Sequence, residues 1–419
     1  MSQQVENEFG VTSFISGGHF VSHLFLLAFP PLFPLLAHEF HVSVTSLGVS
    51  ISLIYLAQFL LQIPAGELVD RVGAKWPLVG ALFVTGGSVI LTGFTDSYLW
   101  FMGFVFLSGI GQVSIHPADY ALLDAAGGES TEGKRFSAHT SAGFVGFAVV
   151  PVVVSSLTGL YNWHVALIAI GAIGVVYAGV LAIWLAPVHR TQLASIDSSS
   201  KADSDDAKES ESGSRFGSVG LLKRPLIAGM FGFFVLNTIG ISGLETYTTS
   251  IAASGFGFLT STGNTALTAF FAVTAVFTLV GGWLADRYNV FRLIEVGLVG
   301  SALVLWVGIA LGLTPVSMIV VWGVAGVGIG VALPARDRIT NSLSSGSSTG
   351  ASFGIVYTGL TVGGVLAPVV IGRIIESADG VVGTAAVGAS FLFAAALVYV
   401  LFVYHRSHTV SGAQPSPGD

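Results

Sequence analysis

The sequence predicts an all-α integral membrane protein with twelve transmembrane helices in two pseudo-symmetric six-helix bundles. Hydrophobic residues make up 53% of the chain and charged residues only 9%, against roughly 25% charged in ordinary soluble domains. Apolar runs long enough to cross a bilayer follow one another along most of the chain. Charged motifs also recur at a constant distance in the two halves. Together these observations exclude a soluble protein with a single anchor.

Apolar runs of about 20 residues give twelve spans by the usual length criterion. We expect them to begin near Phe14, Val44, Trp76, Tyr98, Phe136, His164, Pro225, Thr265, Arg292, Val316, Ala351 and Val382. An even number of spans places both termini on one side of the membrane. The first thirteen residues contain no Lys or Arg. They therefore lack the charged start of a cleaved secretory signal, and we expect the first helix to be retained.

The basic residues predict the orientation. Of the 16 Lys and Arg residues, all but Arg373 lie beside the loops that follow even-numbered spans, in the central polar segment, or after the last span. The positive-inside rule makes that side cytoplasmic. We therefore expect a multi-pass protein of the plasma membrane with both termini in the cytoplasm.

A polar segment divides the chain into two halves. Residues 187–224 are rich in Ser, Asp, Glu and Gly, which predicts a disordered cytoplasmic linker. A six-helix half is expected at 1–186, a second at 225–405, and a polar cytoplasmic tail at 406–419. A spacer is the preferred role for the linker, and a regulatory or partner-binding segment is the alternative.

The residue types exclude several functions. Cysteine is absent, so disulfides, thiolate metal sites and cysteine nucleophiles are excluded. The net charge of −7 arises mostly from the linker, and no basic cluster with interleaved aromatics indicates nucleic-acid binding. The loops are too short for a catalytic domain, and no Walker-type phosphate loop could drive a pump. We expect no enzyme, no cofactor and no resident metal, with the lipid bilayer and a small-molecule substrate as partners.

The segment from Gly66 to Lys75 puts four charged residues and two glycines between long apolar runs. We expect it to be a short loop at the water interface, with Gly66 and Gly73 in a tight turn. The segment resembles the loop between helices 2 and 3 of the major facilitator superfamily, although Ala74 stands where a basic residue is usual. The matching residues are Gly66, Asp70, Arg71, Gly73 and Lys75. The alternative is a simple interfacial charge pair.

The second half repeats this pattern. Gly282-Trp283-Leu284-Ala285-Asp286-Arg287 matches the earlier motif at an offset of 286 − 70 = 216 residues. Two proline pairs keep nearly the same offset, since 334 − 117 = 217 and 368 − 151 = 217. Three anchors in one register indicate duplication of a six-helix unit, as in this superfamily. The resemblance implies a secondary transporter that works by alternating access.

The first span carries His19 and His23, which share one helix face because they are four residues apart. Ionisable groups inside a bilayer normally face the bundle interior or a water-filled cavity. Three functions compete: a proton carrier, a ligand for the solute, or a transition-metal site, for which the same run supplies no carboxylate or thiol. The structural alternative is a pair of neutral packing histidines.

The fourth span ends with His116-Pro117. Together with His19, this pair resembles the fosmidomycin-resistance type of exporter within the superfamily, and that resemblance implies export. Two departures put the direction in question: Val105 stands where proton-driven exporters carry an arginine, and Val150-Pro151 stands where they carry Gly-Pro.

The duplication also suggests a gate. Asp119 corresponds to Arg336, because 336 − 119 = 217. The hypothesis is that Asp119, with His116 or His139 nearby, meets Arg336 or Arg338 and closes the cytoplasmic side in the outward-facing state. The alternative is that each charge marks its own helix end. The other residues assigned to the conformational switch are Asp70, Arg71, Lys75, Asp286 and Arg287.

The repeated motif has expected docking partners. Asp70 is expected against the start of the eleventh span, because a helix N-terminus attracts a carboxylate. Asp286 is expected to mirror it against the fifth span.

The seventh span offers Asn237 near mid-depth and Glu245 in the outer half. The resemblance implies that this span lines the cavity, so Glu245 is a second candidate for coupling; a solvated position at the outer mouth is the alternative.

The preferred function is proton-coupled export of a small organic solute. Uptake of an organic anion is the alternative, with His19, His23 and Arg336 attracting the charge. A non-transporting sensor or a channel is a third class. Because both halves lie in one chain, we expect a monomer to suffice.

Overall fold

The computed structural model describes residues 2–185, 219–343 and 349–411, and every regular element in these ranges is helical. Within them, twelve helices are long and apolar enough to cross a membrane. The candidate spans begin within a turn or two of the positions expected from the apolar runs. The predicted all-α fold with twelve spans is confirmed.

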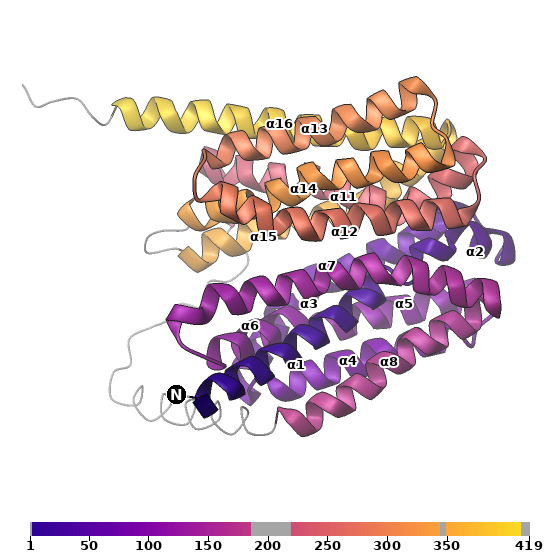
Figure 1. Ribbon diagram of the computed structural model, residues 1–419, viewed down its shortest axis with the longest axis horizontal. Coiled ribbons are helices and arrows are strands. Elements are labelled where there is room, and N and C mark those ends of the chain that lie inside the picture. Colours follow the sequence, from indigo (N-terminus) through magenta and orange to yellow (C-terminus); the bar gives the residue numbers. More distant parts are fainter. Residues whose placement is uncertain (1, 186–218, 344–348, 412–419) are drawn as a thin grey trace, which may run out of the picture.

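The two halves are stacked one above the other (Figure 1). The N-terminal half comprises α1 (Ser2–Leu26), α2 (Phe33–Glu39), α3 (Val44–Val72), α4 (Lys75–Thr92), α5 (Tyr98–Gln112), α6 (Ile115–Ala125), α7 (Glu129–Leu160) and α8 (Trp163–Trp184). The C-terminal half comprises α11 (Pro225–Ser250), α12 (Thr260–Ala285), α13 (Val290–Leu311), α14 (Pro315–Leu343), α15 (Thr349–Ser377) and α16 (Gly380–Ser411). The start of α1 and the end of α16 lie at the same end of the molecule (Figure 1).

Helix α3 includes most of the charged segment from Gly66 to Lys75, which the sequence predicted to be a loop. The helix continues through Glu67 and Asp70 to Val72, and only Gly73, with a φ of 79°, and Ala74 separate it from α4. The predicted loop is therefore two residues long, and Gly66 is helical. Arg71 lies 3.5 Å from Glu67 across one turn, a spacing that supports a helix. Charge marks where the chain meets water, whereas the helix ends at the glycine with positive φ.

The predicted linker lies mostly outside the described residues, since 186–218 are not among them. Its last part, Val219–Lys223, forms a short 3-10 helix, and Leu221 and Leu222 pack against the hydrophobic core. The predicted disorder is therefore wrong for these residues. Helix α16 extends to Ser411, so the boundary predicted after residue 405 falls inside a helix.

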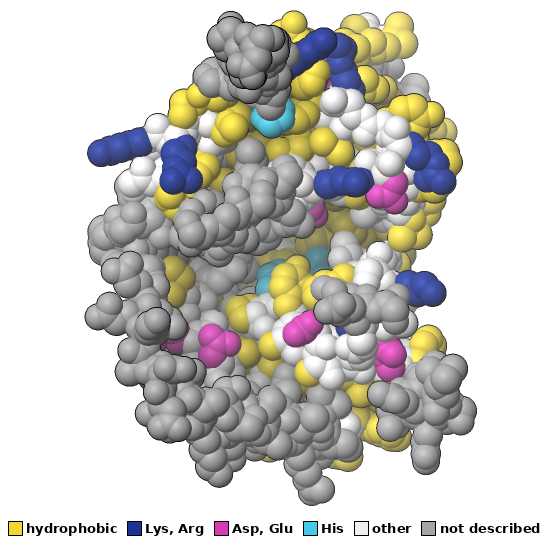
Figure 2. All heavy atoms as spheres, turned by 90° about the vertical axis from the view of Figure 1, so that its left-hand side faces the viewer, with side chains coloured by type: hydrophobic (Ala, Val, Ile, Leu, Met, Phe, Trp, Pro, Cys, Tyr) yellow, Lys and Arg dark blue, Asp and Glu magenta, His cyan; other side chains and the backbone are white. Residues whose placement is uncertain are grey.

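The halves meet mainly where α3 packs against α15 and α7 against α12. At the end away from the termini, Thr45 N donates to Glu376 Oε1 over 2.9 Å, and Ser52 Oγ donates to the carbonyl of Val365 over 2.8 Å. Figure 2 looks onto the opposite end and shows a hollow between the halves, with histidine side chains inside it. The structure is closed at one end and open at the end that carries the termini.

Loss of the Glu376 carboxylate should loosen the closed end. We expect Glu376→Gln to shift the ratio of closed to open conformers at that end about fivefold, or roughly 1 kcal/mol, because Glu376 is exposed and water screens the bond. The chain has no cysteine, so spin labels can be attached at Asp96→Cys and Leu259→Cys alone. The distance between these two labels would report how far apart the two halves are at this end. Glu39→Gln, an exposed carboxylate at the same end, is the control. An unchanged distance distribution in Glu376→Gln would contradict the assignment.

Candidate functional site

Four histidines and one aspartate converge in the N-terminal half, between α1, α6 and α7. The ring centroid of His19 lies 3.9 Å from that of His139, 4.2 Å from that of His23 and 5.3 Å from that of His116. Asp119 completes the group, and we call these five residues the histidine cluster. The sequence predicted His19 and His23 for the cavity and the other three for a gate. The structure brings them together in one site.

Asp119 is the innermost member of the cluster. Its side chain is 0% exposed, and its Oδ2 lies 3.4 Å from Nδ1 of His19 and 3.7 Å from Nε2 of His139. Within the described residues, neither carboxylate oxygen has a hydrogen-bond partner. A buried carboxylate is stable only when it is neutral or faces an opposite charge. The protonation of Asp119 is therefore tied to that of the histidines beside it.

Two glycines of α7 let the cluster form. A Cβ at Gly143 would lie 2.6 Å from the ring of His19 and 2.7 Å from that of His23, and a Cβ at Gly146 would lie 2.5 Å from the carbonyl of Phe20. Any larger residue would push α1 away from α7. This close packing of α1 against α7 explains how the histidines reach one another.

One side of the cluster faces the hollow. His116 and Tyr120 are exposed, whereas His19 and His139 are 5% and 1% exposed. The ring centroid of Tyr120 lies 5.9 Å from that of His116 and 6.0 Å from that of His139. The cluster thus runs from groups in contact with solvent to a buried carboxylate, as a path for protons requires.

The same geometry offers metal ligands. His19, Asp119 and His139 each supply one ligand atom, and these atoms lie within 4.8 Å of one another. Imidazole and carboxylate donors suit several divalent transition metals. The first span alone supplies no carboxylate for such a site, whereas Asp119 comes from α6. The arrangement could hold protons or a divalent cation.

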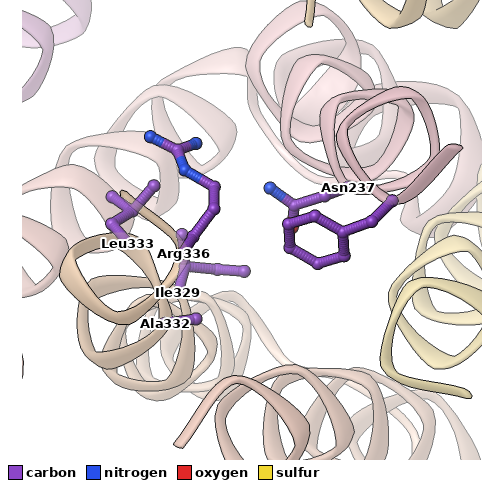
Figure 3. A pocket seen from close by; sticks show the side chains of 6 residues that line it. Asn237, Ile329, Ala332, Leu333 and Arg336 are labelled. Carbon is purple, nitrogen blue, oxygen red and sulfur yellow. The ribbon is translucent and has the colours of Figure 1, made fainter. Parts of the chain in front are cut away.

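A second group of side chains lies in the C-terminal half, between α11 and α14. Figure 3 shows Asn237 of α11 and Arg336 of α14 on opposite sides of a narrow pocket. The side chains lining it are Phe233, Asn237, Ile329, Ala332, Leu333 and Arg336. The guanidinium of Arg336 lies 4.9 Å from the ring centroid of Phe234.

Arg336 and Arg338 each pair with an aspartate of their own half. Nη2 and Nε of Arg336 each lie 2.8 Å from Oδ1 of Asp337. Nη1 of Arg338 lies 2.8 Å from Oδ1 of Asp286. The predicted pairing of Asp119 with these arginines concerns a state closed at this end. It stays a prediction, because the present structure is open there.

Several residues of the repeated motif contact neighbours in their own half. Asp286 binds Arg338 of its own half, and its docking on the fifth span stays a prediction. Arg287 stacks on Trp283, with 4.2 Å between the guanidinium carbon and the ring centroid. Asp70 is exposed, and the side chains at the start of α15 lie outside the described residues, so its docking stays a prediction. Lys75 is 4% exposed, and its Nζ lies 4.5 Å from the ring centroid of Trp76.

The remaining predicted cavity residues lie on α11. Asn237 is 4% exposed and lines the pocket. Glu245 is half-buried, and no contact among the described residues joins it to the histidine cluster. Its role in coupling therefore stays a prediction.

Comparison with known proteins gives a family match and several partial relatives. The Major Facilitator Superfamily matches residues 15–264 and 248–418. An uncharacterized transporter, YybO of Bacillus subtilis, is 27% identical over 167 residues, which are 40% of this chain and 38% of that protein. The 4-hydroxybenzoate transporter PcaK of Pseudomonas putida is 28% identical over 156 residues, 36% of this chain and 34% of that protein. The probable galactarate/D-glucarate transporter GarP of Escherichia coli K12 is 27% identical over 161 residues, 36% and 35% of the two chains.

Solved structures share the fold at low identity. A bacterial homolog of the human lysosomal transporter Spinster, in an inward-facing and occupied conformation, has a TM-score of 0.70 and 14% identity, covering 98% of this chain and 99% of that one. A mutant of the nucleoside transporter NupG has a TM-score of 0.74 and 14% identity, covering 94% and 99%. The curated relatives named above are transporters by name, and the chain matches little more than a third of the length of each. With the family match over most of its length, the chain belongs to the Major Facilitator Superfamily.

Proposed function

We propose that the chain is a secondary transporter that carries a small organic anion together with protons by alternating access. The observation that supports this most is the histidine cluster, a buried carboxylate among four imidazoles at the edge of the hollow between the halves. Relatives of this chain include transporters named for 4-hydroxybenzoate and for galactarate/D-glucarate, which are carboxylates. These names favour the organic anion over other solutes.

The charge of the cluster favours symport. Each proton taken up there makes the hollow more positive, which favours an anion, and a bound anion favours the proton to the same extent. Positive linkage of this kind moves both in one direction, whereas an antiporter requires the two ligands to disfavour each other. The groups that act on Asp119 and its histidines from the surrounding helices are His19 and His23 of α1, His116 and Tyr120 of α6, His139 of α7 and Tyr177 of α8.

Export is the second candidate. The resemblance of His116-Pro117, with His19, to the fosmidomycin-resistance type favours it, and both that type and the antiport direction stay predictions. An exported anion would need protons to weaken its binding, which is the opposite of the linkage expected from a cluster of imidazoles.

The orientation of the protein in the membrane follows from the distribution of its basic residues along the sequence. The basic residues favour cytoplasmic termini in the plasma membrane, and the hollow would then face the cytoplasm. Both halves lie in one chain, so a monomer contains the whole translocation path.

Proton flux in proteoliposomes tests this function. With a pH dye inside, we expect addition of a transported carboxylate to acidify the lumen, faster at lower external pH, and preloaded solute to stimulate labelled uptake by counterflow. Chelator is present throughout because the cluster could also hold a divalent cation, and protein-free vesicles correct for permeation of the neutral acid. Carboxylate uptake without acidification would refute coupling, and luminal alkalinisation would establish antiport instead.

A further inference from the structure

We propose that the pocket between Arg336 and Asn237 binds the carboxylate of a small monocarboxylic acid whose remaining part is apolar or aromatic. This inference rests on the proposed function and adds the class of solute and the place where it binds. It is carried by the composition of the pocket, which combines one partly buried guanidinium and one buried amide with apolar walls.

Arg336 is held in a defined orientation. Its side chain is 13% exposed, Asp337 binds its Nε and Nη2, and the ring of Phe234 lies beneath the guanidinium. Tyr357 donates its hydroxyl to Asp337 over 2.9 Å and fixes that carboxylate in turn. This ion pair uses Nε and Nη2, so Nη1 can donate to a ligand in the pocket. A planar guanidinium that is already positioned recognises a carboxylate with little loss of side-chain freedom.

Asn237 provides a second polar contact from the facing helix. Its amide is buried on α11 and lies across the pocket from Arg336 (Figure 3). An amide NH₂ group donates to a carboxylate oxygen, so the two side chains can hold one carboxylate between α11 and α14.

The rest of the pocket selects against hydroxyl groups. Its other walls are Phe233, Ile329, Ala332 and Leu333, none of which offers a side-chain hydrogen bond. Sugar-acid hydroxyls would be buried there without partners, which is unfavourable. A compact aryl or alicyclic monocarboxylate, with one charged end and an apolar remainder, matches the chemistry of these walls.

Equilibrium binding to the purified full-length protein tests the inference. Calorimetric titration with benzoate, cyclohexanecarboxylate and gluconate should show the first two binding about tenfold more tightly than gluconate. Arg336→Gln should weaken benzoate binding about tenfold or more, and Arg336→Lys should weaken it less. Leu333→Asn should reduce the preference for benzoate over gluconate. Arg292→Gln, at an exposed arginine of α13, is the matched control and should bind like the wild type.

The outcomes separate this inference from the proposed function. Wild-type affinity for benzoate in Arg336→Gln would overturn the site, and gluconate binding as tight as benzoate binding would overturn the solute class. Neither result would affect carboxylate-driven acidification in vesicles, which tests the proposed function alone. Conversely, Arg336-dependent benzoate binding without any proton flux would refute coupling and leave the site intact. The unfolding temperature of each variant shows whether a loss of binding reflects a loss of fold.

Discussion

Replacing Asp119 by Asn is expected to lower proton-driven solute uptake about a hundredfold or more, the scale reached when one member of a buried charged group is removed. Asp119 is the only carboxylate of the histidine cluster, and its side chain is 0% exposed. The amide keeps the size of the side chain but can neither take up nor release a proton. Counterflow should persist, because exchange of solute for solute requires no net proton movement. Initial rates of luminal acidification and of counterflow in proteoliposomes measure the two processes separately.

The matched control lies on the same helix. Asp124 is also on α6, but it is exposed, so Asp124→Asn should transport like the wild type. Undiminished acidification in Asp119→Asn would show that protons bind elsewhere, with Glu245 as the next candidate. Loss of counterflow together with acidification would point to a structural fault, which the unfolding temperature of the purified variant would reveal.

Gly143→Ala is expected to reduce uptake about tenfold. Its methyl group would lie within 2.7 Å of the rings of both His19 and His23, closer than carbon atoms can approach. Overpacking of this kind typically destabilises a protein by about 1–3 kcal/mol. The two rings would rotate or α1 would shift, so the distance from His19 to Asp119 would change. Uptake rates measured across a range of external pH would show both the loss of rate and a changed pH dependence.

Gly133 provides the comparison for this substitution. It lies on the same helix, α7, and nothing is within 4 Å of the position that its Cβ would occupy. Gly133→Ala should leave uptake unchanged and could stabilise the helix by up to about 1 kcal/mol. If Gly143→Ala transported like Gly133→Ala, the close approach of α1 to α7 would be unnecessary for function.

The fold was predictable from the sequence because its main signal is local. An apolar run of about 20 residues identifies a span without knowledge of its neighbours, and the twelve candidate spans agree with this reading. The segment from Gly66 to Lys75 was misread because polarity reports contact with water, not the end of a helix. The positive φ of Gly73, which ends α3, is a backbone property that composition does not reveal.

The members of the site were predictable, but their grouping was not. Ionisable residues inside spans are unusual enough to attract notice, and this identified His19, His23 and Asp119. Their convergence depends on how α1 crosses α6 and α7, which the contacts of Gly143 and Gly146 determine. The duplication places Asp119 and Arg336 at equivalent positions of the two halves. Residues at equivalent positions do not have to be in contact.

Asp337 was missed, although the sequence contained a signal for it. Arg336-Asp337-Arg338 places an acid between two bases near the end of α14. An adjacent opposite charge competes with any partner farther along the chain. In the structure Asp337 forms an ion pair with Arg336, and Arg338 forms one with Asp286.

All five members of the histidine cluster belong to one six-helix half, and the pocket with Arg336 belongs to the other. A rigid rotation of the halves leaves distances within each group unchanged and alters only which side of the membrane each one meets. In the language of protein engineering, the two halves are separable modules. Under the proposed function, a chimera that kept residues 1–186 and took its second half from another member of the superfamily is expected to combine the ion specificity of one parent with the cargo of the other.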